Sequence, residues 1–217
     1  MTKAVDQGAS RGSATATASG RTRQETIGLF LDAAERLLIS SGAAAVTTRR
    51  LAAEAGLNHG LVHYYFGSVE EVELQVLERF TARLVERQRA MYAADAPFLE
   101  KWRTAMRYID EDLEAGYPKV LAELWALTWN RPELRDRTAN AWDAWRGVLT
   151  DAFERAIDEY GLDRDRYPVK ALVTLVLTFN NGLLLERLTG MSEGHRELLD
   201  WIDNWLEDLE RGKGRRG

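Results

Sequence analysis

Two histidines four residues apart are the first candidates for chemistry in this 217-residue sequence. His59 and His63 fall on one face of a predicted helix, and this i, i+4 spacing can hold a metal ion. The sequence offers one further histidine, His195, and no cysteine, whereas zinc sites usually have three or four such ligands. No serine–histidine–aspartate arrangement or glycine-rich phosphate loop accompanies the pair, so we expect no catalytic residues, no metal and no cofactor. We favour DNA contact or simple solvent exposure for both side chains.

The two histidines belong to the second of two short predicted helices, which span residues 48–55 and 59–66. The turn between these helices contains Gly56, and the small Ala52 lies four residues earlier, where closely crossing helices need a small side chain. The positions that must pack to fix the crossing are apolar or aromatic: Leu51, Ala55, Leu57, Val62 and Tyr65. This pattern indicates a helix-turn-helix. Helices this short are marginally stable alone, so a third helix over residues 22–40 has to supply their core.

This segment also carries a family resemblance. The sequence VTTRRLAAEAGLNHGLVHYYF at 46–66, followed by GSVEEV at 67–72, resembles the DNA-binding signature of TetR/AcrR-family transcriptional regulators. The detailed resemblance covers about residues 23–72, and the rest of the chain is similar in length, helix number and apolar character. The resemblance implies an all-α fold. An N-terminal three-helix helix-turn-helix DNA-binding domain would be followed by a C-terminal helical ligand-binding and dimerisation domain.

Candidate DNA contacts follow from the resemblance and from helix-turn-helix geometry. The helix over 59–66 should enter the major groove with its first turn nearest the bases, and the start of the preceding helix offers amides, hydroxyls and charge to a phosphate. The predicted DNA-binding residues are Thr47, Thr48, Arg49, Asn58, His59, Gly60, Leu61, His63 and Tyr64. Two positions depart from the family: Val69 replaces the lysine that commonly meets a phosphate, and His59 stands where lysine or arginine is usual. We therefore expect few phosphate contacts from each DNA-binding domain.

The charge distribution is compatible with a nucleic-acid partner. The chain has 29 Lys and Arg against 34 Asp and Glu, a formal charge of −5, which by itself argues against DNA binding. Residues 1–66, however, hold seven basic and five acidic side chains, a charge of +2, and the remainder carries −7. DNA binding depends on local positive charge and not on the total. The negative total therefore does not exclude DNA.

Hydrophobic spacing divides the chain into about nine helices without an alternating strand pattern. After the first three, the predicted helices span 69–93, 97–115, 118–130, 132–160, 168–189 and 193–211. We predict four parts. These are a disordered tail at 1–20, the DNA-binding domain at 21–68, the ligand-binding and dimerisation domain at 69–211, and a basic tail at 212–217.

Aromatic side chains concentrate on three successive helices of the C-terminal part. Most should form core, but tryptophans between bundle helices can also line an apolar pocket. A polar i, i+4, i+7 stripe on the otherwise apolar helix 168–189 would hydrogen-bond a ligand, a symmetry-related copy, or its own helix. The candidate ligand-binding residues are Trp102, Met106, Trp125, Trp129, Trp145, Thr174, Thr178 and Asn181.

The resemblance further implies a homodimer in which helices 168–189 and 193–211 pair with those of a second copy. Helix 193–211 is more apolar than a surface helix requires, although core packing explains this equally well. A two-fold dimer would place two DNA-reading helices about one DNA turn apart, on a palindromic operator. The expected function is a ligand-responsive repressor released by a small, largely apolar effector. The alternatives are a ligand-independent DNA-binding dimer or an activator of the same fold.

The expected location is the cytoplasm. No segment reaches the length of uncharged apolar sequence that a membrane helix needs, and the N-terminus lacks an apolar signal core. We therefore expect no membrane partner, and we do not expect an enzyme.

Overall fold

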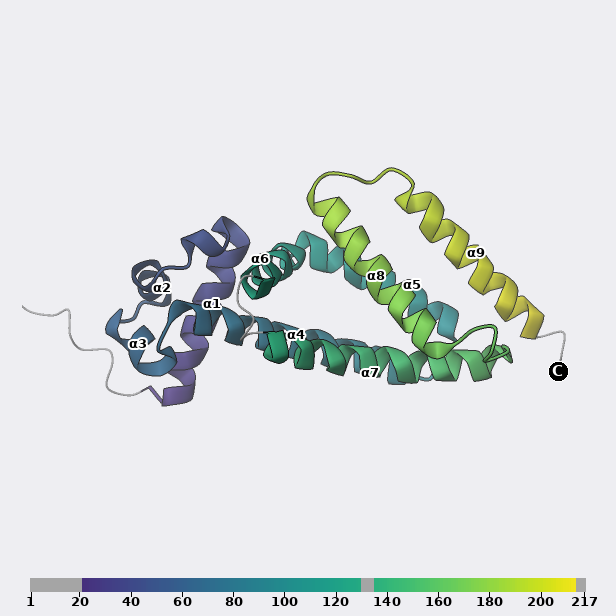
Figure 1. Ribbon diagram of the computed structural model, residues 1–217, viewed down its shortest axis with the longest axis horizontal. Helices are drawn as coiled ribbons and strands as arrows, with labels where there is room; N and C mark the ends of the chain where they lie inside the picture. Colours follow the sequence, from purple (N-terminus) through teal and green to yellow (C-terminus); the bar gives the residue numbers. More distant parts are fainter. Residues whose placement is uncertain (1–20, 130–134, 214–217) are drawn as a thin grey trace, which may run out of the picture.

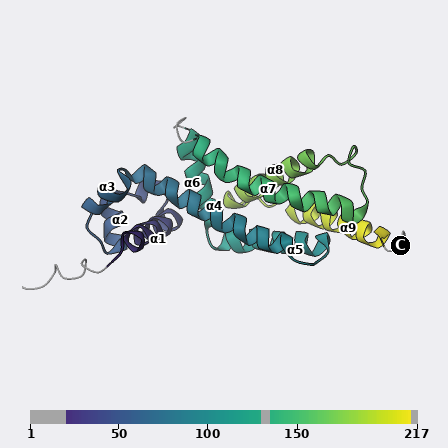
Figure 2. The same ribbon diagram turned by 90° about the horizontal axis from the view of Figure 1, so that it is seen from below.

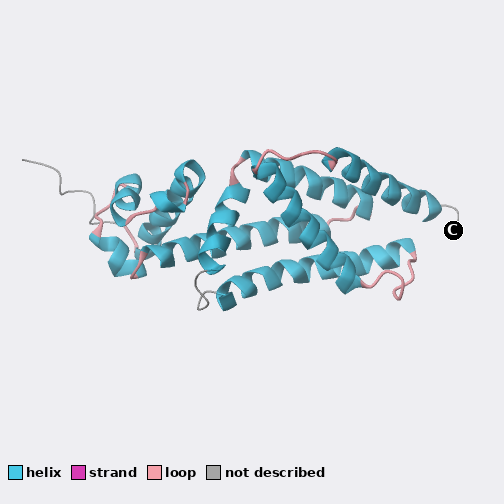
Figure 3. Cartoon of the chain, turned by 45° about the horizontal axis from the view of Figure 1, so that its top comes forward, coloured by secondary structure: helices cyan, strands magenta, loops and turns pink. Residues whose placement is uncertain are grey.

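The computed structural model describes residues 21–129 and 135–213 (Figure 1). Within these ranges every regular element is helical (Figure 3), which confirms the predicted all-α fold of about nine helices. The elements are α1 (Arg23–Ser41), η1 (Ala43–Ala45, a 3-10 turn), α2 (Thr48–Ala55), α3 (Gly60–Phe66), α4 (Val69–Ala93), α5 (Phe98–Glu114), α6 (Tyr117–Trp129), α7 (Arg135–Tyr160), α8 (Val169–Leu188) and α9 (His195–Lys213). The predicted tail at 1–20 lies outside the described residues. Of the predicted basic tail at 212–217, Gly212 and Lys213 continue α9, and the rest lies outside.

Helices α1 to α3 form one end of the molecule (Figure 1). The first helix begins at a complete capping box, in which the Thr22 hydroxyl accepts from the Glu25 N–H at 3.2 Å and the Thr22 N–H donates to the Glu25 carboxylate at 2.7 Å. Behind this start, Phe30 is fully buried and meets the Phe66 ring edge-on at 5.9 Å between centroids. As predicted, α1 supplies the core that two short helices could not form by themselves.

The long helix α4 belongs to both ends of the molecule (Figures 1 and 2). Its first half packs Val72 and Leu77 into the N-terminal core, and its second half packs Val85 and Met91 into the body. Its start is capped as predicted, since the Ser68 hydroxyl accepts from the N–H of residue 71 at 3.2 Å.

The body consists of the second half of α4 and helices α5 to α9, with α4 and α7 lying side by side along it (Figures 1 and 2). The start of α5 is fixed to the end of α7, because the Phe98 N–H donates to the Glu159 carboxylate and the Leu99 N–H to the Tyr160 hydroxyl, each at 3.2 Å. The last helix is held on the outside, where Arg103 of α5 pairs with two carboxylates of α9.

Helix α6 connects the body to the N-terminal end. Val120 is fully buried in the N-terminal core, and the Lys119 ammonium donates to the Ile39 carbonyl, in the last turn of α1, at 3.1 Å. Just before α6, Gly116 has φ +78°, and a Cβ there would lie 2.9 Å from Ile39 Cγ2. Only glycine allows this close approach between α6 and α1.

Candidate nucleic-acid interface and effector cavity

The turn between α2 and α3 is fixed at both ends. The second helix begins at Thr47, whose hydroxyl accepts from the Arg50 N–H at 3.3 Å, and ends at Gly56 in the left-handed conformation, φ +65°. The Leu57 N–H then donates back to the Ala52 carbonyl at 2.9 Å, which closes the helix end as in a Schellman motif. These bonds set the angle at which α3 leaves the turn.

The packing predicted for the helix crossing is confirmed. Leu51 and Val62 are fully buried, and Ala52 is nearly so. The remaining three predicted packing positions are partly buried against the same core: Ala55, Leu57 and Tyr65. These buried contacts therefore set the orientation of α3 relative to α1.

The start of α3 is an exposed surface ordered by a side chain. The Asn58 Oδ1 atom accepts from the Gly60 N–H at 2.8 Å. The predicted start is one residue early, because α3 begins at Gly60 and its N-cap residue is His59, which makes no side-chain cap bond. Asn58, His59 and Gly60 are exposed and Leu61 is half-buried. Four of the predicted DNA-binding residues therefore lie together at one helix start.

His59 and His63 differ in whether the ring has a hydrogen-bond partner. The Nδ1 atom of His63 lies 3.0 Å from the Gly67 carbonyl, so this ring is engaged at the end of α3. His59 is exposed at the opposite end, and Tyr64 is 72% exposed while its ring meets that of Tyr65 edge-on. Within the described ranges, no group of three histidine, aspartate or glutamate side chains is placed to hold a metal ion.

The charged side chains near α3 divide into paired and unpaired groups. Arg36 is committed to Glu54 at 2.7 Å, and Arg79 to Asp32 and Glu35 at 2.7 and 2.8 Å. Among the described residues, Arg49 and Arg50 at the start of α2 are exposed and form no ion pair. Val69 at the start of α4 is half-buried against the N-terminal core. Positive charge that can face a phosphate therefore lies at the start of α2 and at the start of α1, where the exposed Arg23 has its guanidinium carbon 5.6 Å from the centroid of the Tyr65 ring.

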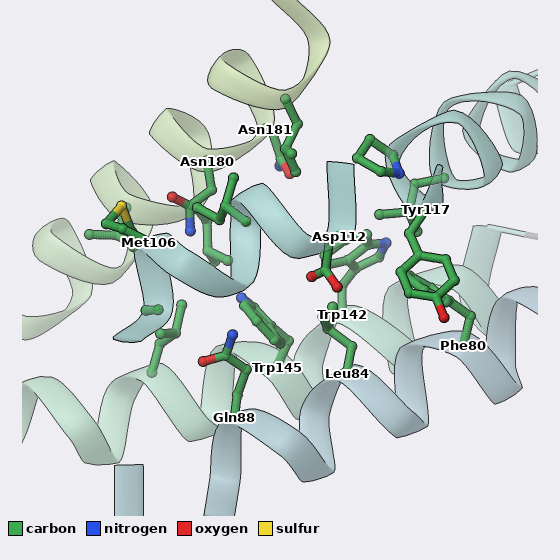
Figure 4. A pocket seen from close by; sticks show the side chains of 18 of the residues that line it. Phe80, Leu84, Gln88, Met106, Asp112, Tyr117, Trp142, Trp145, Asn180 and Asn181 are labelled. Carbon is green, nitrogen blue, oxygen red and sulfur yellow. The ribbon is translucent and has the colours of Figure 1, made fainter. Parts of the chain in front are cut away.

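The body contains a cavity of about 60 Å³ between α4, α5, α6, α7 and α8 (Figure 4). Its walls are mainly aromatic and aliphatic side chains. Six aromatic rings line it: Phe80, Tyr92, Trp102, Tyr117, Trp142 and Trp145. The free volume is several times the ~15 Å³ that one ordered water needs on this measure, so the cavity has room for a small organic molecule.

Three polar side chains face this cavity. Two have a buried oxygen without a hydrogen-bond partner, and the third is a carboxyl with a raised pKa. Gln88 is only 4% exposed, and its Oε1 atom is buried without a hydrogen-bond partner. The Oδ1 atom of Asn180 is likewise buried without a hydrogen-bond partner. Burial raises the pKa of the Asp112 carboxyl, and a hydrogen bond and ion pair from Arg87 lower it by less, so the net pKa is raised. Figure 4 shows all three on the cavity wall.

The structure brings together half of the predicted ligand-binding residues. Trp102, Met106, Trp145 and Asn181 line the cavity. Two others do not line the cavity: Trp129 is 73% exposed at the end of α6, and Trp125 has its ring 5.4 Å from that of the lining residue Trp142.

The polar stripe on α8 also requires a correction. Thr174 and Thr178 are exposed and do not line the cavity. The Thr174 hydroxyl donates to the Lys170 carbonyl at 2.8 Å, which is the bond back to its own helix that sequence reasoning left open. Only Asn181 of the stripe reaches the cavity.

Sequence reasoning missed Gln88, Asp112 and Asn180 as cavity residues. A signal for the first two exists in the helical spacing. On α4 the cavity-facing positions are 80, 84, 88 and 92, and on α5 they are 102, 105, 106, 109 and 112. Gln88 and Asp112 are thus polar residues at positions of an otherwise apolar stripe, where a buried polar group needs a partner.

A second hollow, an open groove of about 350 Å³, lies between α5, α7, α8 and α9. Its lining is apolar or aromatic throughout, and it includes Leu175, Trp201 and Trp205. The groove opens on a face where apolar side chains are unusually exposed. Of the nine large apolar or aromatic side chains that are exposed among the described residues, seven lie on α8, α9 or their connection: Leu175, Leu185, Leu188, Met191, Leu198, Trp201 and Trp205.

Helix α8 is apolar on two sides, because it lines the cavity on one side and exposes large apolar side chains on another. Its length and its mean hydropathy of 1.3 reach what a membrane span requires, which sequence reasoning did not anticipate. The helix packs against α6 and α7 and faces the cavity with Asn180 and Asn181. These contacts are those of a helix in a protein bundle, and α8 is not a membrane span.

Comparison with known sequences gives one family match. Residues 30–75 match the family described as bacterial regulatory proteins, tetR family. The matched segment contains α2, α3, most of α1 and the start of α4. No curated protein sequence matches the chain significantly.

Solved structures match over most of the described chain. A transcriptional regulator from Saccharomonospora viridis, solved in complex with choline, has a TM-score of 0.68 at 23% identity and covers 86% of this chain and 96% of its own. The regulator FadR from Bacillus subtilis, solved in complex with stearoyl-CoA, has a TM-score of 0.58 at 16% identity, covering 85% and 98%. A protein from Mesorhizobium loti described as a TetR-family regulator has a TM-score of 0.65 at 17% identity, covering 87% and 97%. At these identities the likeness is one of fold.

Proposed function

We propose that this chain is a ligand-responsive repressor that binds a palindromic operator as a homodimer. Residues 30–75 match the family described as bacterial regulatory proteins, tetR family, and the helices have the fold of a protein described as a TetR-family regulator. The observation that carries the proposal is the exposed start of α3, which is ordered by the hydrogen bond from the Gly60 N–H to Asn58 Oδ1 and held by a buried helix crossing. We place the DNA-binding domain at 21–68 and the ligand-binding and dimerisation domain at 69–211.

Helix α3 is the proposed reading helix. Its exposed first turn, Asn58 to Leu61, would face base edges in the major groove, where Leu61 can contact a thymine methyl group. The start of α2 would hold a phosphate through its free first-turn amides and through Thr47, Thr48 and Arg49. The exposed Tyr64 hydroxyl is suited to a second phosphate. His63 would have a minor role, because its ring is already engaged by Gly67.

The proposed dimer uses α8 and α9. Seven large exposed apolar side chains gather there, and a monomeric protein rarely leaves such a patch uncovered. A two-fold axis through this face would place two copies of α3 on the same side of the dimer, as a palindromic operator requires. Thr174 and Thr178 belong to this exposed side of α8, so we reassign them from the ligand to the proposed interface.

Effector binding would act through α6. This helix contributes Tyr117 and Leu121 to the cavity wall and Val120 to the N-terminal core. A ligand that displaces α6 would therefore move α1, and with it the reading helix. The expected cost to operator affinity is about 1–3 kcal/mol, the usual size of such couplings.

Selection of bound fragments from random double-stranded DNA tests the proposal, repeated with a panel of metabolites. We expect a palindromic sequence with half-sites about one helical turn apart, and weaker binding with at least one metabolite. His59→Ala should change the selected bases, whereas Arg49→Ala should weaken binding to every sequence. Arg155→Ala, which removes an exposed arginine from α7, is the matched control and should change neither.

Each outcome bears on a separate part of the proposal. Absence of an enriched sequence would overturn DNA recognition, and monomeric sedimentation at micromolar concentration would overturn the dimer. Enrichment that no metabolite changes would favour the second candidate, a ligand-independent DNA-binding dimer. Increased transcription from the selected site would indicate an activator of the same fold. In each case the protein acts in the cytoplasm and not as an enzyme.

A further inference from the structure

We propose that the cavity between α4 and α8 binds a small organic cation, an ammonium group with apolar substituents, in preference to a neutral or anionic molecule of the same shape. The inference rests on the proposed function only in treating this cavity as the effector site. It adds a positive charge to the small, largely apolar effector expected from sequence.

The walls of the cavity suit a cation. Six aromatic rings line a volume of about 60 Å³, so a molecule of this size would touch several of them at once. The face of an aromatic ring carries negative potential and attracts a desolvated cation, most strongly in the case of tryptophan. Trp102, Trp142 and Trp145 supply three indole rings from two helices.

The charge in the cavity has a single sign. Among the described lining residues, Asp112 is the only aspartate, glutamate, lysine, arginine or histidine. Its partner, Arg87, approaches from α4 and is held outside by the Tyr108 ring, with its guanidinium carbon 4.3 Å from the ring centroid. Because no described lysine, arginine or histidine lines the cavity, an anionic ligand would lose its hydration without gaining a counter-charge.

The unpartnered oxygens add hydrogen-bond acceptors beside this charge. The Oε1 atom of Gln88 and the Oδ1 atom of Asn180 are buried without partners, and such groups are costly to leave unsatisfied. An ammonium N–H that reaches either oxygen would satisfy it, and charge-assisted hydrogen bonds of this kind are the stronger ones. Burial also raises the pKa of Asp112 despite its pairing with Arg87, so a further positive partner would stabilise this carboxylate.

A charge series on one molecular frame tests the proposal. Benzylammonium, benzyl alcohol and benzoate share a ring and differ in charge, and isobutylammonium, isobutanol and isobutyrate form a smaller series. Dissociation constants for the full chain at pH 7 would be measured by calorimetry and by quenching of tryptophan fluorescence. In at least one series we expect the cation to bind about tenfold more tightly than the alcohol, and the carboxylate to bind most weakly.

Two matched substitutions on α5 test whether the preference for the cation over the alcohol depends on Asp112. Asp112→Asn keeps the shape of the side chain and removes its charge, so the cation should lose its advantage and bind within about threefold of the alcohol. Glu111→Gln makes the same charge change at the next, exposed position and should leave the advantage intact. Circular dichroism melting would show whether each variant is folded. The order in which the unaltered chain binds the cation, the alcohol and the carboxylate is measured without either variant.

Several results would overturn the proposal. Equal or tighter binding of the alcohol or the carboxylate would do so, as would a cation preference that survives in a folded Asp112→Asn variant. Failure of all six probes to bind at millimolar concentration would also exclude the cavity as a cation site. The selection of operator DNA is read independently, so none of these results would be confused with a failure of DNA recognition.

Discussion

The N-terminal core and the core of the body are built from similar side chains but packed differently. At the N-terminal end Phe30, Leu51 and Val62 are fully buried, and the adjoining hydrogen-bonded caps fix each turn. The body holds a cavity and an open groove, and Gln88 and Asn180 have buried atoms without partners. A closed core suits a surface that must keep one shape against DNA. A hollow core suits a region that repacks around a ligand.

The largest expected effect separates the two cores directly. Phe30→Ala should lower the free energy of unfolding by about 3–5 kcal/mol, because it opens a void in a closed core. Met106→Ala, at the half-buried cavity wall, should cost about 1 kcal/mol, because that side chain already borders open space. Urea unfolding followed by circular dichroism measures both. Equal losses would show that the body is as tightly packed as the N-terminal end.

Removal of the hydrogen bond between α6 and α1 should lower the free energy of unfolding less than Phe30→Ala does. Lys119→Met keeps the aliphatic stem and deletes the hydrogen bond to the Ile39 carbonyl, which should cost about 1 kcal/mol. Operator affinity without effector should be nearly unchanged, while the loss of affinity caused by effector should shrink. Fluorescence anisotropy of labelled operator, with and without effector, would detect the difference. An undiminished response would mean that the two regions communicate by another route.

The Val69 position allows the DNA-binding surface to be strengthened. Val69→Lys should add about one phosphate contact per subunit, which raises operator affinity and steepens the dependence of log K on log salt by about 0.9 for each contact. The unaltered chain should show a shallow slope, since few described basic side chains near α3 are unpaired. A steep slope in the unaltered chain would contradict this view of the surface.

The smallest effect concerns an ion pair that connects α7 to the start of α4. Burial raises the pKa of Glu71, but hydrogen bonds from Arg137 and Gln75 outweigh it and hold the net pKa below its usual value. The ionised carboxylate therefore stabilises the fold above about pH 4.3, and this contribution is lost as the pH falls through the lowered pKa.

A substitution at Arg137 isolates this contribution. Arg137→Gln should cost about 0.5–1 kcal/mol at neutral pH, since the arginine is partly exposed. The cost should vanish in acid, and melting temperatures across pH would show it. A cost that is independent of pH would assign the effect of Arg137 to packing instead of charge.

The comparison of the two regions also explains what sequence could predict. The start of α4 was predictable because local chemistry decides it, through the Ser68 cap. The direction in which α8 faces was not, because this helix is apolar on both sides and its periodicity does not identify the inner one. Thr178 was therefore assigned inward, whereas the structure exposes it. The cavity was harder still, since Gln88 and Asp112 become significant only when α4 and α5 are brought together.

Helix α6 has one further consequence for the proposed regulator. Since this helix is shared by the cavity and the N-terminal core, the coupling it carries must be reciprocal. Operator DNA would weaken effector binding by the same factor by which effector weakens operator binding. Dimers on the operator would then require a higher effector concentration than free dimers. The threshold of the genetic response would therefore depend on how much of the protein is bound to DNA.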